Sequence, residues 1–359
     1  MKIGIFGGAF NPPHTGHVKA AETAIDYNQL DLLIVIPTGI PPHKTMPCGT
    51  PPPDARLLLT KNAFSGISKA QVSDIEIFST NSNYTIDTVH SIKKQYPDTQ
   101  LFLLVGNDMY DSLDTWKESE KLLSSVTPVL LPRDVTPISS TEIRSLLTER
   151  KGIEYLTEQN YSLIIKHRYY NAKPDWDWLR EKAYQKLDKQ RIPHVKACEG
   201  SAAVLAEYWD VDICDAREAA ILHDITKKLD FNENMCIMCE GELPVKKYSI
   251  DNAKLLHAVT AAIVAKEEFG ISDTVADAIR SHTTGKAQMS TLDKIIYIAD
   301  YIEATRDFPG VEQMRKMAFE DIDKAMKAGL EMVVNDLKSR NIIPDEDTYN
   351  ALRDLGDKK

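Results

Sequence analysis

Residues 2–17 read KIGIFGGAFNPPHTGH, and this stretch decides how the first half of the chain folds. Its apolar, β-branched start predicts a buried strand, and the glycine pair that follows allows a turn that can approach a ligand closely. A helical pattern then begins, so His14 and His17 lie at a helix N-terminus. Free backbone N–H groups and the helix dipole favour an anion there. The stretch therefore predicts a strand, a phosphate-binding turn and a helix, in that order.

The overall composition is that of a globular protein with two domains. At 359 residues the chain exceeds what one core normally holds, while 43% hydrophobic and 27% charged residues are ordinary. A net charge of −10 argues against a nucleic-acid binder but leaves room for a nucleotide site. Five cysteines, an odd number, favour a reducing compartment. Neither a membrane span nor a signal-peptide layout is evident, so we expect a cytoplasmic protein, with a homo-oligomer left open.

The first 170 residues alternate strand-like and helix-like segments, which predicts a Rossmann-like α/β domain with a parallel sheet at 1–170. The expected strands are 2–6, 32–36, 72–77, 101–105 and 126–131. The expected helices are 18–28, 54–64, 85–95, 116–123, 140–148 and 158–168. Ligands of such sheets bind at the carboxyl ends of the strands.

The composition changes after a polar, proline-containing linker, which we expect at 171–177. Helical periodicity then continues almost without a break, so we expect an all-α domain, a helical bundle, at 178–342. A C-terminal tail is expected at 343–359.

Polar side chains also follow the other expected strands of the first domain. Ile40 to Lys44 form a proline-stiffened turn that ends in a cation, and Asp108 could accept hydrogen bonds from ribose hydroxyls. The Ser139–Glu142 spacing is that of a capping box, which predicts a second anion site beside Arg144. Two phosphate-binding helix starts in one sheet indicate a nucleoside triphosphate.

Simpler interpretations of these motifs stay open. A glycine pair is usually only a turn, and a Ser-Ser-Thr-Glu run is usually only a helix cap. His14 and His17 could also be a metal pair, although no carboxylate or thiol partner lies nearby in the sequence. The order of the pieces is more specific than any one of them.

Taken in order, the motifs resemble those of bacterial nicotinate-nucleotide adenylyltransferase, of the HxGH nucleotidyltransferase superfamily. The resemblance covers nearly all of residues 1–170 and lies in GGAFNPPHTGH at 7–17, IPPHK at 40–44, YTIDT at 84–88, Trp116 and SSTEIR at 139–144. It implies transfer of AMP from ATP to nicotinate mononucleotide, which gives deamido-NAD and pyrophosphate. The implied reaction is a direct in-line attack with Mg²⁺ and no covalent intermediate.

The same resemblance implies roles for individual residues. His14, His17 and Arg144 would be catalytic, with the two histidines holding the ATP phosphates as charge develops. Ser140 and Thr141 would hold the β- and γ-phosphates together with Arg144. The other implied contacts with ATP or the nicotinate substrate are Gly7, Gly8, Phe10, Lys44, Thr85, Gly106, Asp108 and Trp116.

Within that set, Trp116 would stack on the nicotinate, Lys44 would meet phosphate and Asp108 would contact the adenylate ribose. Two departures from the family pattern stand out. Asn107 replaces the usual Ala, and the connection at 132–138 is shorter than the family's, which usually carries another strand.

The helical half holds imidazole and carboxylate side chains that could bind metal. These are His194, His223, Asp224, His257, His282 and Asp300. Histidines buried in helical bundles are more often core residues than ligands, but here every histidine of the helical half belongs to the set. Ligands of this kind suit Fe, Mn or Zn and would fit two ions that share Asp224, an arrangement suited to hydrolysis of phosphate esters.

This order resembles the HD phosphohydrolase superfamily, and in more detail its symmetrical bis(5′-nucleosyl)-tetraphosphatases. The resemblance covers roughly 178–342 and lies in RIPH at 191–194, LHDITK at 222–227, LHA at 256–258, IRSHTTG at 279–285, ADYIE at 299–303 and FPGV at 308–311. It implies cleavage of diadenosine tetraphosphate to two ADP at a centre of two divalent metals, Fe or alternatively Mn or Zn.

Further roles follow from the second resemblance. Asp224 and Lys227 would be catalytic, and Lys227, Lys286 and Arg306 would bind substrate phosphate. The pair Cys236 and Cys239 has the spacing of a metal or redox motif, but no second pair accompanies it, so we interpret both as structural or incidental thiols.

Two alternatives to this bifunctional enzyme stay open. The same folds could act on other nucleotides, with the HD domain hydrolysing guanosine tetraphosphate or deoxynucleotides. In the other alternative, the N-terminal domain is an inactive nucleotide sensor that regulates the hydrolase.

Overall fold

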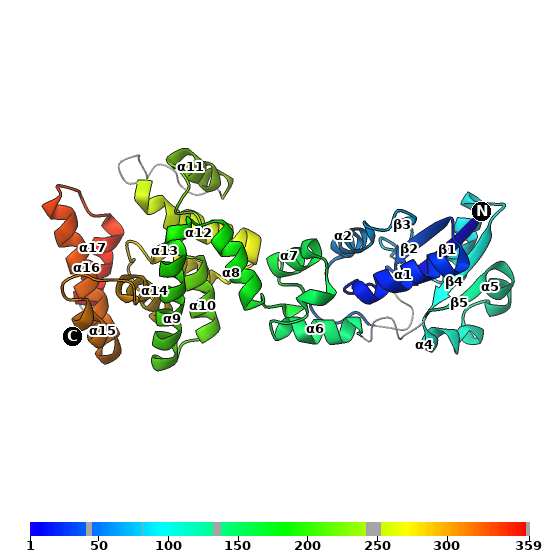
Figure 1. The fold of residues 1–359 in the computed structure, drawn as a ribbon, viewed down its shortest axis with the longest axis horizontal. Coiled ribbons are helices and arrows are strands. Elements are labelled where there is room, and N and C mark those ends of the chain that lie inside the picture. The colour runs from blue at the N-terminus through cyan, green and yellow to red at the C-terminus, as the bar shows by residue number, and fades with distance from the viewer. Residues whose placement is uncertain (41–44, 81, 132–137, 242–252, 357–359) are drawn as a thin grey trace. The chain divides into compact units, whose positions relative to one another are not determined.

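A computed structural model describes residues 1–40, 45–80, 82–131, 138–241 and 253–356 (Figure 1). The chain forms two compact units, Met1–Asp175 and Trp176–Lys359. The first unit is α/β, and the described residues of the second unit form helices only. The predicted fold class is therefore confirmed for both halves of the chain.

Five parallel strands form the sheet of the first unit, in the order β3-β2-β1-β4-β5. Their bounds are β1 Lys2–Gly8, β2 Leu32–Pro37, β3 Ala70–Val72, β4 Gln100–Val105 and β5 Thr127–Leu130. In the register, Ile5 of β1 lies between Ile34 of β2 and Leu103 of β4. These central strands are apolar because both faces of a parallel sheet are covered.

Helices cover the sheet and bury its two faces in separate cores. Their bounds are α1 Thr15–Asn28, α2 Pro53–Phe64, α3 Thr85–Gln95, α4 Asn107–Tyr110, α5 Ser119–Ser125, α6 Ser140–Thr148 and α7 Glu158–Lys166. One core joins Phe6 and Leu33 to α1 and α2, and the other joins Ile3 and Ile5 to α3 and α5. The carboxyl ends of β1, β2 and β4 are thereby left for the loops that carry the predicted site.

Among the elements whose bounds differ from those expected are one strand and one helix. The strand expected at 72–77 is wrong over most of its length, because β3 ends at Val72 and a turn follows. That turn buries Ile77 and leaves Ile75 43% exposed. The alternating apolar residues after Val72 therefore belong to a turn and not to a strand. The helix expected at 116–123 begins only at Ser119, because Trp116 ends a short 3₁₀ turn.

The second unit is a bundle of helices. Their bounds are α8 Trp176–Gln185, α9 Ile192–Tyr208, α10 Ile213–Leu222, α11 Phe231–Glu240, α12 Ala253–Phe269, α13 Asp273–Ser281, α14 Thr291–Ile302, α15 Val311–Glu320, α16 Ile322–Ser339 and α17 Glu346–Gly356. Helix α14 is buried along nearly its whole length, which explains its apolar sequence. Among the described residues, none of the helices has both the length and the apolar content needed to span a membrane.

Candidate active sites

Both histidines of the first motif close the N-terminus of α1 through their Nδ1 atoms. His14 Nδ1 accepts a hydrogen bond from the backbone N–H of Gly16, and His17 Nδ1 accepts one from the backbone N–H of His14, each at 3.2 Å. The two ring centroids lie 3.8 Å apart. A neutral imidazole whose Nδ1 accepts must carry its proton on Nε2. Each ring therefore offers an Nε2–H donor to an incoming acceptor.

The surroundings of these two imidazoles favour their neutral forms. Burial lowers the pKa of His14 to about 4. The pKa of His17 lies well below its usual value, mainly because the ring is buried and secondly because His14 lies beside it. The free site thus holds two hydrogen-bond donors, not two cations, and a bound phosphate would favour protonation.

Helix α6 brings the second predicted anion site next to the first. Ser140 Oγ donates to the carbonyl of Pro12 at 2.9 Å, and an Arg144 Nη atom donates to the carbonyl of Asn11 at 2.6 Å. The other Nη atom of Arg144 donates to Thr141 Oγ1 at 2.9 Å, and the predicted capping box is present. Ser140 and Arg144 are therefore tied directly to the loop that leads into His14, and Thr141 is joined to it through Arg144.

One functional candidate, Arg56 of α2, was missed by the sequence analysis. Its guanidinium is buried and donates to the carbonyls of Ala9 at 3.1 Å, Thr38 at 2.8 Å and Gly39 at 3.1 Å. It thereby joins the loops that follow β1 and β2. The sequence could have indicated Arg56, because it lies one turn before Thr60 on the buried face of α2, where arginine is unusual.

The predicted glycines and Phe10 differ in what they contribute. A Cβ atom on Gly7 or on Gly106 would meet no atom within 4 Å, so a ligand can approach the backbone there. On Gly8 it would meet the Phe10 ring at 3.3 Å. Phe10 is buried and packs edge-on against His17, with ring centroids 5.0 Å apart. Phe10 therefore supports His17 from the core.

Thr85 and Trp116 come from neighbouring segments. Thr85 begins α3, and Trp116 packs partly buried against the core that contains this helix. Lys117, next to Trp116, lies over the Tyr84 ring at 4.3 Å and pairs with Asp87 at 3.2 Å. The start of α3 and the Trp116 segment are thereby held together. Lys44, the segment 132–137 and the side chain of Asp108 lie outside the described residues.

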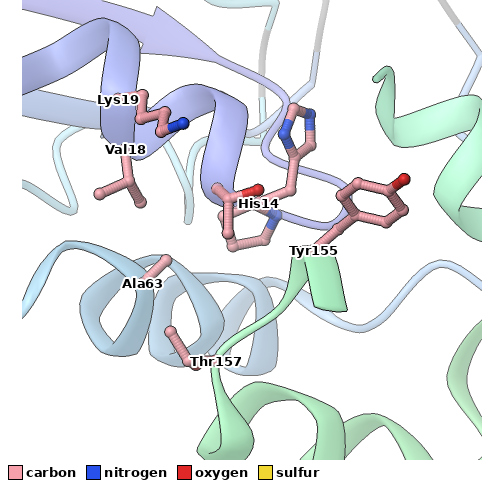
Figure 2. A pocket seen from close by; sticks show the side chains of 8 residues that line it. His14, Val18, Lys19, Ala63, Tyr155 and Thr157 are labelled. Carbon is pink, nitrogen blue, oxygen red and sulfur yellow. The ribbon is translucent and has the colours of Figure 1, made fainter. Parts of the chain in front are cut away.

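A small cavity lies beside the N-terminus of α1 (Figure 2). Its volume is about 210 Å³. The lining residues are Pro13, His14, Thr15, Val18, Lys19, Ala63, Tyr155 and Thr157. It adjoins the predicted phosphate site through His14, but its lining is mainly apolar, so we assign it no ligand.

Four of the six predicted metal ligands of the second unit, the histidines, converge on a fifth, Asp224. Asp224 Oδ2 lies 3.2 Å from His223 Nε2 and 3.9 Å from His194 Nε2. Asp224 Oδ1 lies 3.2 Å from His257 Nε2 and 3.7 Å from His282 Nε2. Each carboxylate oxygen therefore faces two imidazoles, although the residues come from separate parts of the helical unit.

Asp300 completes this cluster. Its Oδ1 atom lies 3.0 Å from His194 Nε2. Two sets of ligand atoms lie close enough to hold an ion, His194 with His223 and Asp300, and His223 with Asp224 and His282. These two sets share His223, whereas the sequence predicts Asp224 as the shared ligand.

The histidines are held in the form that binds metal. The Nδ1 atoms of His223, His257 and His282 lie 2.6 to 2.7 Å from the carbonyls of Ala220, Lys254 and Ile279. Carbonyls accept, so each Nδ1 carries the proton and each Nε2 presents a lone pair. Nε2 atoms then face one another at 3.1 Å for His257 with His282 and at 3.4 Å for His194 with His223. Facing lone pairs repel unless a cation lies between them, so the donor set fits divalent metal.

Asp224 supports the same conclusion. It is fully buried, and its Oδ1 atom has no hydrogen-bond partner among the described residues. A buried carboxylate oxygen without a hydrogen bond is costly unless an ion or another donor satisfies it.

Basic side chains surround the cluster. Arg191 Nε lies 2.5 Å from Asp224 Oδ2, Lys227 Nζ lies 3.4 Å from Asp224 Oδ1, and an Arg306 Nη atom lies 2.7 Å from Asp300 Oδ1. Arg191 was missed as a candidate, although the RIPH motif contains it. Lys286 instead pairs with the carboxylates of Asp277, at 3.3 Å, and Asp293, at 3.1 Å.

Comparisons with known proteins define the class of each unit. Residues 5–146 match the family model of cytidylyltransferase-like proteins, and residues 191–305 match that of the HD domain. The chain thus joins a nucleotidyltransferase domain to an HD hydrolase domain, as the sequence motifs predicted. HD domains bind divalent metal, which agrees with the His and Asp cluster of the second unit.

Relatives narrow this class to a family. A protein of Halalkalibacterium halodurans named "Probable nicotinate-nucleotide adenylyltransferase" is 37% identical over 174 residues, which cover 43% of this chain and 84% of that protein. The chain belongs to the nicotinate-nucleotide adenylyltransferase family. A Mycoplasma genitalium protein named "Probable nicotinate-nucleotide adenylyltransferase/Ap4A hydrolase" is 28% identical over 365 residues, covering 94% of this chain and 99% of that protein.

A solved structure is similar to the helical half. It is the crystal structure of a "predicted HD superfamily hydrolase involved in NAD metabolism" from Clostridium acetobutylicum. Its sequence is 34% identical, and the match covers 51% of this chain and 98% of that chain with a TM-score of 0.50. The fusion of the two enzyme classes that the sequence predicted is therefore confirmed.

Proposed function

We propose that the first unit transfers AMP from ATP, taken as its Mg²⁺ complex, to nicotinate mononucleotide, releasing deamido-NAD and pyrophosphate. The second unit hydrolyses diadenosine tetraphosphate to two ADP. The observation that carries the first activity is the joining of His14 and His17 to the start of α6 through the loop at 11–12. The observation that carries the second is the placement of imidazoles around both oxygens of Asp224.

In the first reaction the phosphate of nicotinate mononucleotide attacks the α-phosphorus of ATP, and pyrophosphate leaves. The chain contributes by positioning the two substrates and by stabilising the negative charge that develops on the phosphates. The Nε2–H donors of His14 and His17 hold ATP phosphate oxygens as negative charge builds on them. Arg144, with the hydroxyls of Ser140 and Thr141, holds the β- and γ-phosphates that leave.

The nicotinate end of the acceptor is assigned to the other side of the site. Trp116 stacks on the nicotinate ring, and Thr85 borders it at the start of α3. The open space above Gly7 and Gly106 supports close approach of the nucleotide to the backbone. Lys44 and Asp108 stay predicted contacts with phosphate and ribose.

In the second reaction the imidazole and carboxylate ligands would hold two divalent ions, Fe or alternatively Mn or Zn. These are His194, His223, Asp224, His257, His282 and Asp300. When bound, the ions supply Lewis acidity toward the phosphate and the attacking water. Lys227 and Arg306 lie at the edge of the cluster with 40% and 36% of their side chains exposed, which suits binding of substrate phosphates. Lys286 would add a contact only by leaving its present carboxylate partners.

Product assays test both activities on one preparation. With ATP, nicotinate mononucleotide and Mg²⁺, we expect pyrophosphate and deamido-NAD in equal amounts. With diadenosine tetraphosphate and added Fe²⁺ or Mn²⁺, we expect ADP as the product, and unequal products such as ATP with AMP would contradict symmetrical cleavage. Competition with guanosine tetraphosphate and deoxynucleotides separates the proposed substrate from the rival ones. ATP binding without turnover would instead support the sensor alternative.

A further inference from the structure

His194 differs from the other three histidines of the cluster in what holds its Nδ1 atom. The other three are fixed by main-chain carbonyls, at Ala220, Lys254 and Ile279. His194 Nδ1 instead lies 3.0 Å from the side-chain oxygen Oε1 of Glu303. A carboxylate accepts a stronger hydrogen bond than a carbonyl and makes the imidazole a more basic ligand.

Glu303 is itself fixed in place. Its side chain is fully buried, and both carboxylate oxygens have donors. The backbone N–H of Thr305 donates to Oε2 and the Thr305 hydroxyl donates to Oε1, both at 2.6 Å. Arg306 Nε lies 3.5 Å from Oε1 and adds positive charge. A buried carboxylate with this many donors is held in one rotamer.

The geometry beyond His194 shows what this fixation achieves. With Nδ1 donating to Glu303, the lone pair of Nε2 faces Asp300 Oδ1 at 3.0 Å and His223 Nε2 at 3.4 Å. Glu303 and Asp300 also come from the same segment, at the end of α14, and Arg306 contacts both of them. The segment 300–306 therefore supplies one direct ligand and the support of another.

We propose that Glu303 is a positioning residue, which fixes the tautomer and orientation of His194 and so tightens divalent-metal binding at the His194–His223–Asp300 end of the cluster. This inference rests on the proposed metal centre. It adds Glu303 and Thr305, which are not among the six predicted ligands, to the residues on which that centre depends.

Metal affinity of the full-length protein tests the proposal without any assay of hydrolysis. Mn²⁺ or Zn²⁺ alone is titrated against a competing chelator. Glu303→Gln should weaken one bound ion by about 10- to 100-fold and leave the other within about threefold. Glu303→Asp should recover part of the loss. Glu199→Gln is the matched control, because Glu199 is a buried carboxylate on the His194 helix that pairs with Arg180 and Arg217 instead.

A milder variant keeps the test valid if Glu303→Gln does not fold. Thr305→Val removes only the hydroxyl donor and should weaken the same ion a few-fold. Nitrogen NMR of the metal-free protein gives a second readout, in which the Nδ1 signal of His194 should shift in Glu303→Ala.

The outcomes separate this inference from the proposed function. Unchanged metal affinity in both Glu303→Gln and Thr305→Val, with wild-type protein that binds metal and cleaves diadenosine tetraphosphate, would overturn the role of Glu303 alone. Wild-type protein that binds no divalent ion would overturn the metal centre and the inference together.

Discussion

His17 Nδ1 accepts a hydrogen bond from the backbone N–H of His14, and the two imidazole rings lie 3.8 Å apart. Both rings use Nδ1 to close the helix and are kept neutral by burial. The pair therefore meets ATP as two fixed Nε2–H donors. Fixed donors need little rearrangement when charge develops on a phosphate, which is the condition for electrostatic catalysis.

The neutral state of His14 predicts how stability depends on pH. The unfolded chain protonates this residue near pH 6.5, whereas the folded chain does so only near its pKa of about 4. The unfolded state therefore binds more protons between these values, and stability falls as the pH decreases through that window. The loss from this residue is at most about 3 kcal/mol. Urea unfolding at pH 4.5 to 7.5 should show a weaker pH dependence in His14→Asn, which keeps a capping side chain.

The matched control for this prediction is His90→Asn, since His90 lies on the exposed face of α3. It should keep the wild-type pH profile. If His14→Asn kept that profile as well, the burial of a neutral His14 would be contradicted.

The guanidinium of Arg56 predicts a combined effect on stability and substrate binding. Arg56→Met leaves the carbonyls of Ala9, Thr38 and Gly39 without their donor. Each buried orphan costs about 1 to 3 kcal/mol, so we expect a loss of several kcal/mol in the unfolding free energy of the first unit and a higher KM for its substrates. Lys61→Met, on the exposed side of the same helix, should change stability by less than about 0.5 kcal/mol. Equal stability of the two variants would contradict the role of Arg56 in joining the loops that follow β1 and β2.

The aromatic side chain of Trp116 predicts a selective effect on one substrate. Trp116→Ala removes the surface assigned to nicotinate stacking, so the KM for nicotinate mononucleotide should rise about tenfold or more. The KM for ATP is the internal control and should change little. Steady-state kinetics with each substrate varied in turn would show it, and an equal rise of both KM values would place the nicotinate ring elsewhere.

The sequence predicted those features of the protein that short, local motifs encode. The strand–glycine–helix order at 2–17, the capping box at Ser139 and the set of histidines around Asp224 all follow from short motifs, and the structure contains them. The family resemblance then placed them in two enzyme classes.

Features that depend on distant partners were not predictable in this way. The role of Arg56 depends on the carbonyls after β1 and β2, which meet at its guanidinium. The role of Glu303 depends on α9, which brings His194 to the end of α14. The strand expected at 72–77 failed for a similar reason. Ile77 is buried by a turn whose Glu76 accepts from Thr88 at 2.6 Å, and periodicity cannot distinguish such a turn from a strand.

Metal removal predicts a difference between the two activities. Dialysis against a chelator should abolish cleavage of diadenosine tetraphosphate, and added Fe²⁺ or Mn²⁺ should restore it, because the cluster around Asp224 needs a cation between its lone pairs. Adenylyl transfer, assayed with excess Mg²⁺, should be unchanged. Hydrolysis that survives complete removal of metal would contradict the proposed centre.

The most direct test of two separate active sites is one experiment on wild type and three variants. Pyrophosphate release and cleavage of diadenosine tetraphosphate are measured for wild type, His17→Ala and Asp224→Asn. His17→Ala should lose about 10²-fold or more in kcat of the first reaction and keep the second. Asp224→Asn should show the reverse, with Asp336→Asn on the surface of α16 as its control. If His17→Ala or Asp224→Asn lost both activities, or lost neither, the account would be contradicted.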